Sequence, residues 1–175
     1  ALYQQASADN QQPEEVVDPA ACTPLIDGGI RWLRNHQNQD GGWGDTDKSY
    51  SNVATTYLAI AAINLAGQSA AAADQLAQAD KYLEAEGRFS GLKKRYGKDK
   101  TFVVPILTNL ALAKLVSWKE ISALPFELAW FPQSFYRFLG LPVVSYAIPA
   151  LVAIGQARYF HRPPWNPFIR LLRRA

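Results

Sequence analysis

Apolar residues recur at helical spacing through most of the chain, and this periodicity constrains the fold more than any other feature. Two of the expected helices are apolar on nearly every side, whereas the helices beside them are amphipathic or rich in alanine. A helix that is apolar all round is buried, and an amphipathic helix faces water on one side. The alternation predicts an all-α protein with inner and outer helices and no strand. The helices are expected at residues 25–37, 51–65, 69–86, 101–115 and about 143–159.

Residues that stop or cap helices mark the boundaries of these segments. The expected stops are Gly41 with Gly42, Gly67 and Gly87, and the expected cap of the second helix is Ser49 or Ser51. Pro105 is expected in the first turn of its helix, where proline is tolerated. The basic stretch GLKKRYGKDK, residues 91–100, is expected to be a mobile loop.

The composition fits one domain in a reducing compartment. The chain has 175 residues, of which 49% are apolar, and this suffices for one domain with a core. The single cysteine, Cys22, cannot form an internal disulfide, so a cytoplasmic setting is expected. Residues 1–21 are polar and rich in glutamine, which predicts a disordered segment and does not match a signal peptide. Because the sequence contains no methionine, Ala1 is expected to be a trimmed or otherwise non-native start.

Cationic and aromatic residues gather in the last third of the chain. Residues 128–175 contain six arginines and no acidic residue, whereas residues 1–27 contain acids but no lysine or arginine. The longest apolar run, at 139–155, is shorter than the roughly 20 residues that a membrane-spanning helix needs. A buried or interfacial helix is therefore expected there.

The stretch GIRWLRNHQNQDGGW, residues 29–43, combines an aromatic–leucine pair, a glutamine four residues after the leucine, and a closing Gly-x-Trp element. It continues into GDTDKSYSNVATTYLAIAAINLAG at 44–67, and the stretch LPFELAWFPQSFYRFLGLPVVSYAIPALVAIGQARYFHRPPWNP follows at 124–167. The first two segments resemble the QW repeat of squalene–hopene and related triterpene cyclases. The third resembles the later part of the N-terminal half of these enzymes. The resemblance covers about residues 22–168.

The resemblance implies that the QW residues are structural. In the family, the glutamine side chain bonds to the backbone at a neighbouring helix end and stacks on the tryptophan. The physical chemistry agrees, because an amide can pair with free backbone groups at a helix end and an indole buries a large area. A second repeat is expected at 79–92, but this segment lacks the glutamine and the tryptophan. The structural residues implied are Trp32, Leu33, Gln37, Gly42 and Trp43.

No catalytic residue is expected in this chain. The family resembled starts its reaction with a protonated aspartate of an Asp-x-Asp-Asp motif in its C-terminal half. Here Asp45 and Asp47 are followed by Lys48, and the resemblance places them in the N-terminal half. Helix capping and a solvated turn are the preferred interpretation of these aspartates.

No metal or organic cofactor is expected either. Calcium binding at Asp40, Asp45 and Asp47 would need a further carboxylate in register, which the sequence lacks. His36 and His161 show no zinc-ligand spacing, which argues against a protein prenyltransferase subunit of related fold. No nucleophile motif supports a Ser–His–Asp or Cys–His site.

Tyr146 is the candidate substrate-binding residue. Cyclisation of a polyprene creates carbocations, and aromatic faces stabilise cations. The resemblance implies that Tyr146, in VVSYAIPA, lines the cavity near the junction of two barrels. Packing in the core is the competing interpretation. The other aromatic residues of interest are expected in the core or facing the membrane: Phe102, Trp130, Phe131, Phe135 and Phe138.

Basic and aromatic residues interleave after residue 157, and three interpretations stay open for them. They suit a nucleic acid, an anionic membrane surface or a solvated linker. The family resembled is monotopic and takes its substrate from the bilayer, which favours the membrane, on the cytoplasmic side in a bacterium, over a nucleic acid. The membrane-surface candidates are Arg158, Tyr159, Phe160, Arg162, Trp165 and Phe168.

The hypothesis is an all-α chain that forms part of an α/α barrel, a toroid of helical hairpin repeats, spanning residues 22–160. The resemblance implies the N-terminal portion of a class II terpene cyclase, an intramolecular transferase or hydro-lyase acting on a polyprene such as squalene. This portion supplies scaffold and one cavity wall and is expected to be inactive alone. The basic segment 161–175 is expected to lead into a C-terminal catalytic half. The alternative is a non-catalytic helical-repeat module that binds a membrane surface or a partner.

Overall fold

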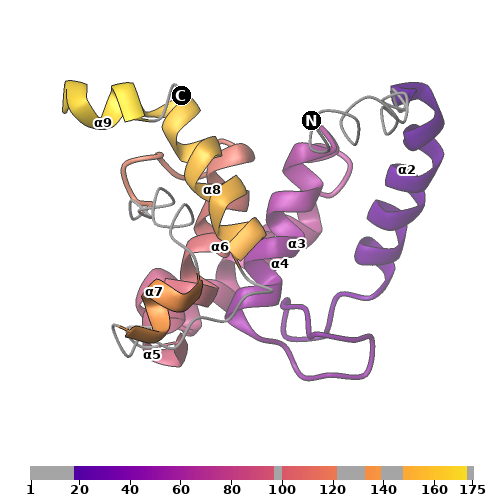
Figure 1. The fold of residues 1–175 in the computed structure, drawn as a ribbon. Helices are drawn as coiled ribbons and strands as arrows, with labels where there is room; N and C mark the ends of the chain where they lie inside the picture. Colours follow the sequence, from indigo (N-terminus) through magenta and orange to yellow (C-terminus); the bar gives the residue numbers. More distant parts are fainter. Residues whose placement is uncertain (1–17, 97–99, 122–132, 139–147, 173–175) are drawn as a thin grey trace.

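The protein is built from helices (Figure 1). The computed structural model describes residues 18–96, 100–121, 133–138 and 148–172. Within these ranges no strand occurs, so the all-α prediction is confirmed. The helices are α2 (Pro19–Asn35), α3 (Val53–Leu65), α4 (Ala73–Ala85), α5 (Arg88–Tyr96), α6 (Lys100–Leu112), α7 (Gln133–Phe138), α8 (Ile148–His161) and α9 (Pro167–Leu172).

Helix α2 begins six residues earlier than the apolar pattern predicted. The Asp18 side chain accepts a hydrogen bond from the Ala20 backbone N–H at 2.9 Å, and Pro19 occupies the first helical position. Both features favour a helix start. The pattern missed this turn because its small residues carry no amphipathic signal. Residues 19–21 of the segment predicted to be disordered are therefore helical, and residues 1–17 lie outside the described part.

The cap of α3 is Asn52 and not Ser49 or Ser51, so that prediction was wrong. The Asn52 side-chain oxygen accepts from the Thr55 N–H at 2.9 Å. Asparagine caps a helix about as well as serine does. The Ser51 hydroxyl instead donates a hydrogen bond to the Asp40 carboxylate at 2.6 Å.

The glycine stops after α3 and α4 are confirmed, but α2 ends at Asn35 with His36 as its cap, before Gly41 and Gly42, and the position of the proline is also corrected. Gly67 and Gly87 follow α3 and α4 with φ of +68° and +79°, in the left-handed region that ends many helices. Helix α6 begins at Lys100, so Pro105 lies beyond the first turn. The ring nitrogen of Pro105 carries no proton, so it cannot donate the usual helical hydrogen bond to the Thr101 carbonyl. The helix continues because its apolar residues are buried.

Helix α5 replaces much of the loop predicted at 91–100, and Lys100 already belongs to α6. The loop prediction was therefore wrong at 91–96 and at 100, and residues 97–99 lie outside the described residues. Leu92 is buried, and the Phe89 ring stacks on Tyr57 of α3 with centroids 5.0 Å apart. Arg88 donates two hydrogen bonds to Asp80 of α4, at 2.8 and 3.0 Å. Tertiary packing outweighs the polar local composition, as it does in most protein helices.

Helix α3 is the centre of the packing. It contacts α2, α4, α5 and α6, and it is buried along most of its length, whereas α4 buries only Ala79 and Leu83. Two core clusters meet on it: one joins α3 to α4, α5 and α6, and the other joins α3 to α2, α4 and Trp43. The predicted division into inner and outer helices is thus present, and the closed barrel stays a prediction.

The two ends of the described chain lie on opposite sides of the molecule (Figure 1). Helix α2, in indigo, stands at one side, and α9, in yellow, stands at the other, with α3 and α6 between them. Helix α8 packs against α6. Among the described residues, none of the helices combines the length and the hydropathy that crossing a bilayer requires.

Candidate functional site

Gln37 connects α2 to α4. It lies two residues beyond the end of α2, and its side-chain Nε2 donates to the Gly41 carbonyl at 2.7 Å and to the Gln75 carbonyl at 2.8 Å. Gln75 belongs to the first turn of α4. The amide therefore works as a double donor to carbonyl oxygens, and not as an acceptor for the free N–H groups of a helix end.

Trp43 connects α2 to α3. The indole is 2% exposed, and its Nε1 donates to the Leu33 carbonyl at 2.9 Å. The Trp43 backbone N–H donates to the Thr56 hydroxyl at 3.0 Å, and the Trp43 carbonyl accepts from the Asn52 N–H at 3.0 Å. The ring itself packs in the core cluster that contains Ile63. One residue thus supplies apolar area and three hydrogen bonds that hold the turn to both helices.

The turn between these residues needs glycine for space. A Cβ atom on Gly41, whose φ is +87°, would lie 2.5 Å from the Gln78 carbonyl oxygen of α4. A Cβ on Gly42 would lie 2.6 Å from the Cβ of Ser51. Real Cβ atoms do not approach other atoms this closely. The glycines let the turn lie directly against α4 and against the extended residues that precede α3.

Of the five QW residues predicted, four meet in this region and one stays on the surface. Leu33 is half-buried and packs against the same cluster as Trp43. Trp32 is 46% exposed, and its ring stacks on His36 with centroids 4.4 Å apart. Trp32 therefore covers the last turn of α2 and does not enter the core.

Two aspartates of the turn, Asp40 and Asp45, accept hydrogen bonds that hold the turn in place. One carboxylate oxygen of Asp45 accepts from the Asn52 side-chain amide at 2.8 Å and from the Thr55 hydroxyl at 2.6 Å. Asp40 accepts from Ser51 and from the Gly42 N–H, the latter at 3.0 Å. Asp45 thereby orients the residue that caps α3. These contacts are those of helix capping and turn formation, the interpretation preferred from the sequence.

Asp47 lies in the exposed part of the same turn, beside Lys48 and Tyr50. Across the ranges that the structure describes, no three His, Cys, Asp or Glu side chains lie together as a metal site requires. Tyr57 has a pKa above its ordinary value because burial disfavours the phenolate, with the nearby Arg88 opposing the shift. That tyrosine belongs to the core between α3 and α5.

Two contacts that fix this region had no signal in the sequence. The Gln68 side chain donates to Asp27 of α2 at 2.6 Å and so ties the turn after α3 back to α2. Thr56 is fully buried within α3 and accepts from the Trp43 N–H. Both depend on residues that are distant in sequence, so local spacing could not reveal them.

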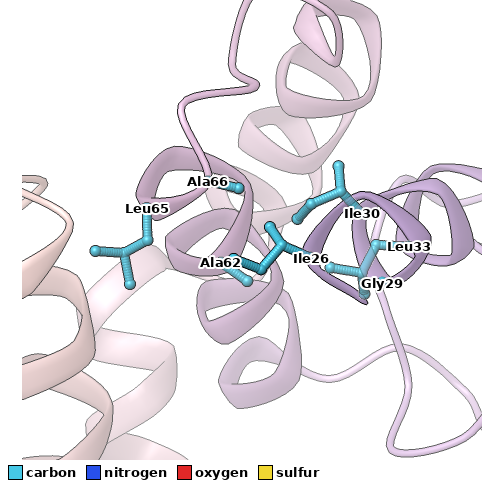
Figure 2. Close-up of a pocket in the computed structure, with 7 residues that line it drawn as sticks. All are labelled: Ile26, Gly29, Ile30, Leu33, Ala62, Leu65 and Ala66. Carbon is cyan, nitrogen blue, oxygen red and sulfur yellow. The ribbon is translucent and has the colours of Figure 1, made fainter. Parts of the chain in front are cut away.

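An apolar groove lies between α2 and α3 (Figure 2). Its volume is about 460 Å³, and it is open to solvent along one side. Only aliphatic side chains and one glycine line it, so it offers no aromatic face and no ionisable group. The lining residues are Ile26, Gly29, Ile30, Leu33, Ala62, Leu65 and Ala66.

The predicted cavity residue Tyr146 lies outside the described residues, as do Trp130 and Phe131. Phe102 lies in α6. Phe135 and Phe138 lie on α7 and are 37% and 87% exposed, so Phe138 is not a core residue.

The aromatic residues near the C-terminal end differ in how far their side chains are exposed. Phe160 is 81% exposed and Trp165 is 98% exposed, with the exposed Arg162 between them in sequence. Tyr159 is half-buried. Phe168 lies in the short helix α9. This exposed set, Phe160, Arg162 and Trp165, is called the aromatic–arginine surface below.

Two other predicted basic residues near the C-terminal end, Arg158 and His161, contact the protein. The Arg158 Nε donates to the Ile121 carbonyl at 2.8 Å. The His161 ring stacks on Trp118 with centroids 4.4 Å apart. Arg158 and His161 therefore dock α8 onto the segment that follows α6, and Arg158 is left out of the aromatic–arginine surface.

The Gln37 contacts generate a prediction about stability. Replacing Gln37 by Ala removes two hydrogen bonds from a half-buried site and should lower the free energy of unfolding by about 1–3 kcal/mol. Gln39, an exposed glutamine in the same turn, is the matched control, and Gln39→Ala should change stability by less than about 0.5 kcal/mol. Urea unfolding of the two variants followed by tryptophan fluorescence measures both values. Equal effects would contradict the structural role of the Gln37 amide.

The family model described as the squalene-hopene cyclase N-terminal domain matches residues 21–154, well over half of the chain. The match includes the whole turn from Gln37 to Trp43 and the helices that it connects. No solved structure matches the chain. The chain belongs to the family of squalene–hopene cyclase N-terminal domains.

Proposed function

We propose that the chain is the N-terminal part of a class II terpene cyclase that converts a linear polyprene, such as squalene, into a polycyclic product. The single observation that carries the proposal is the family match over residues 21–154, since the family consists of terpene cyclases. The reaction begins with protonation of a terminal alkene or epoxide and continues by ring closure through carbocations. Such chemistry needs an acid and a dry, shaped cavity, and it needs no metal or organic cofactor.

The role proposed for this part is scaffold and one wall of the cavity. The polar groups of the Gln37–Thr55 region bond to the fold itself: Asp45 braces the cap of α3, and Gln37 and Trp43 join helices. One oxygen of the Asp45 carboxylate is already used in two hydrogen bonds to residues of α3 and its cap. The general acid is therefore assigned to another part of the enzyme, and the helices are assigned to an α/α barrel.

Tyr146 is proposed to line the cavity. The support is chemical, because a carbocation is stabilised over an aromatic face by about 2 kcal/mol or more when water is excluded. The aliphatic groove between α2 and α3 provides no such face. The cavity is therefore not assigned to this groove.

The proposed activity is tested by incubating squalene with the 175-residue chain and, separately, with the longer polypeptide of which it is a part. Polycyclic product detected by mass spectrometry is expected only with the longer polypeptide. In that protein, Tyr146→Ala should lower kcat by about tenfold to a hundredfold, because loss of 1.4 kcal/mol is tenfold. Tyr146→Phe should retain most of the activity, and Phe138→Ala serves as the control. Product from the chain alone, or no product from either protein, would refute the proposal.

The second part of the proposal is that the aromatic–arginine surface contacts the membrane from which the apolar substrate is taken. Phe160 and Trp165 are almost fully exposed, which is unfavourable in water and favourable at a bilayer interface. Arg162 lies between them, and Arg170 of α9 is also exposed, so cations accompany the rings. The protein is accordingly proposed to be peripheral or monotopic on the cytoplasmic face of a bacterial membrane.

Vesicle sedimentation tests this surface. The chain should sediment with vesicles of phosphatidylcholine and phosphatidylglycerol. The double variant Phe160→Ala, Trp165→Ala should bind these vesicles at least about tenfold more weakly. The reason is that burying one large apolar side chain contributes about 1.5–3 kcal/mol. The double variant Leu25→Ala, Tyr50→Ala removes two other exposed apolar side chains, 77% and 97% exposed, and should bind like the unmodified chain. Equal binding by both variants would exclude this surface.

A further inference from the structure

The last turn of α8 carries part of the aromatic–arginine surface. Phe160 and His161 end the helix, and Arg162 follows it. The Arg162 N–H donates to the Arg158 carbonyl at 2.8 Å, so the helical hydrogen bonding extends to Arg162. The ends of helices fray, because their final turns lack part of the hydrogen bonding of the interior. Phe160 and Arg162 therefore keep a fixed direction only if tertiary contacts hold this turn.

Arg158 makes one such contact, one turn before Arg162. Its Nε donates to the Ile121 carbonyl at 2.8 Å. The Ile121 side chain is 1% exposed and lies in a core cluster with two residues of α6, and Ile154 of α8 packs against the same cluster. Helix α8 is thus held on α6 by apolar packing and by a hydrogen bond near the end of the helix.

A row of three rings leads from the core to the exposed surface. The His161 ring stacks on the half-buried Trp118 with centroids 4.4 Å apart and 12° between the ring planes. Phe160 meets the His161 ring edge to face, with centroids 5.1 Å apart and 89° between the planes. Trp118 itself packs against the core cluster that contains Ile121. The row therefore connects Phe160, which is 81% exposed, to the core.

We infer that Trp118 is a positioning residue for membrane attachment. It holds His161, and through it the last turn of α8, so that Phe160 and Arg162 are presented before the protein meets a bilayer. A surface that is already fixed in its bound arrangement avoids the entropic cost of being ordered during binding. This role rests on the membrane contact proposed above for the aromatic–arginine surface, and it assigns no lipid contact to Trp118 itself.

The chain contains a matched control for this stack. Trp32 and His36 also stack with centroids 4.4 Å apart, at the end of α2. Helix α2 lies on the side of the molecule opposite α9 (Figure 1). Replacing Trp32 therefore removes a stack of the same geometry from a place remote from the aromatic–arginine surface.

Sedimentation of the 175-residue chain with vesicles of phosphatidylcholine and phosphatidylglycerol tests the role of Trp118. Trp118→Ala should bind about threefold to tenfold more weakly than the unmodified chain, because the free energy of an aromatic pair corresponds to about this factor. Trp118→Phe keeps a ring for His161 to stack on and should bind within about twofold of the unmodified chain. Trp32→Ala should bind like the unmodified chain. Unchanged binding by Trp118→Ala, or an equal loss in Trp32→Ala, would overturn the role.

A double-mutant cycle separates positioning from direct lipid contact. In the Phe160→Ala, Trp165→Ala background, adding Trp118→Ala should weaken vesicle binding by less than about twofold, since the rings to be positioned are gone. A further loss as large as in the unmodified chain would show that Trp118 contacts the lipid itself, and it would overturn the positioning role.

Folding of each variant is checked by circular dichroism. If Trp118→Ala does not fold, His161→Ala removes the same stack from its other side and replaces it in both experiments. An unmodified chain that does not sediment with the vesicles refutes the proposed membrane surface together with this role. A chain that sediments and loses nothing on removal of the stack refutes only the role of Trp118.

Discussion

The two hydrogen bonds of the Gln37 amide are the contacts on which the remaining arrangement depends. They join a turn carbonyl at Gly41 to a helix carbonyl at Gln75, and so they fix where α4 lies relative to the end of α2. With that distance fixed, Gly41 and Gly42 must lie against α4 and Ser51, where no Cβ fits. Trp43 is then directed into the core between α2 and α3. A single neutral amide does this because each of its two N–H groups finds a carbonyl oxygen at hydrogen-bond distance.

The polar residues of this stretch bond mainly to the fold itself. Asp40 and Asp45 each accept two hydrogen bonds from the turn and from the first residues of α3 and its cap, so both carboxylates serve to hold the turn in place. The chain instead presents apolar surfaces of two kinds. The groove between α2 and α3 is lined by aliphatic side chains, whereas the aromatic–arginine surface exposes two aromatic rings and an arginine.

The fold was largely readable from the sequence where the signal is local. Apolar periodicity identified α3 and α6, and glycines at Gly67 and Gly87 marked the ends of α3 and α4, because left-handed backbone favours glycine. The apolar pattern failed where contacts between residues distant in sequence determine the local structure. Helix α5 is stabilised by Leu92 in the core and by the ring of Tyr57, neither of which its basic composition indicates. Likewise Asn52 takes the capping position because Asp45 orients it, a contact that spacing alone does not reveal.

Hydrogen exchange of the turn amides tests most directly whether the Gln37–Trp43 element is a rigid connection. The Trp43 N–H is bonded to the Thr56 hydroxyl, and the Asn52 N–H is bonded to the Trp43 carbonyl. If the element holds the helices together, both amides should exchange as slowly as those in the middle of α3, since they open only when the helices separate. Exchange of both amides at rates near those of an unstructured peptide, while α3 stays protected, would show that the turn is only a loop between independently packed helices.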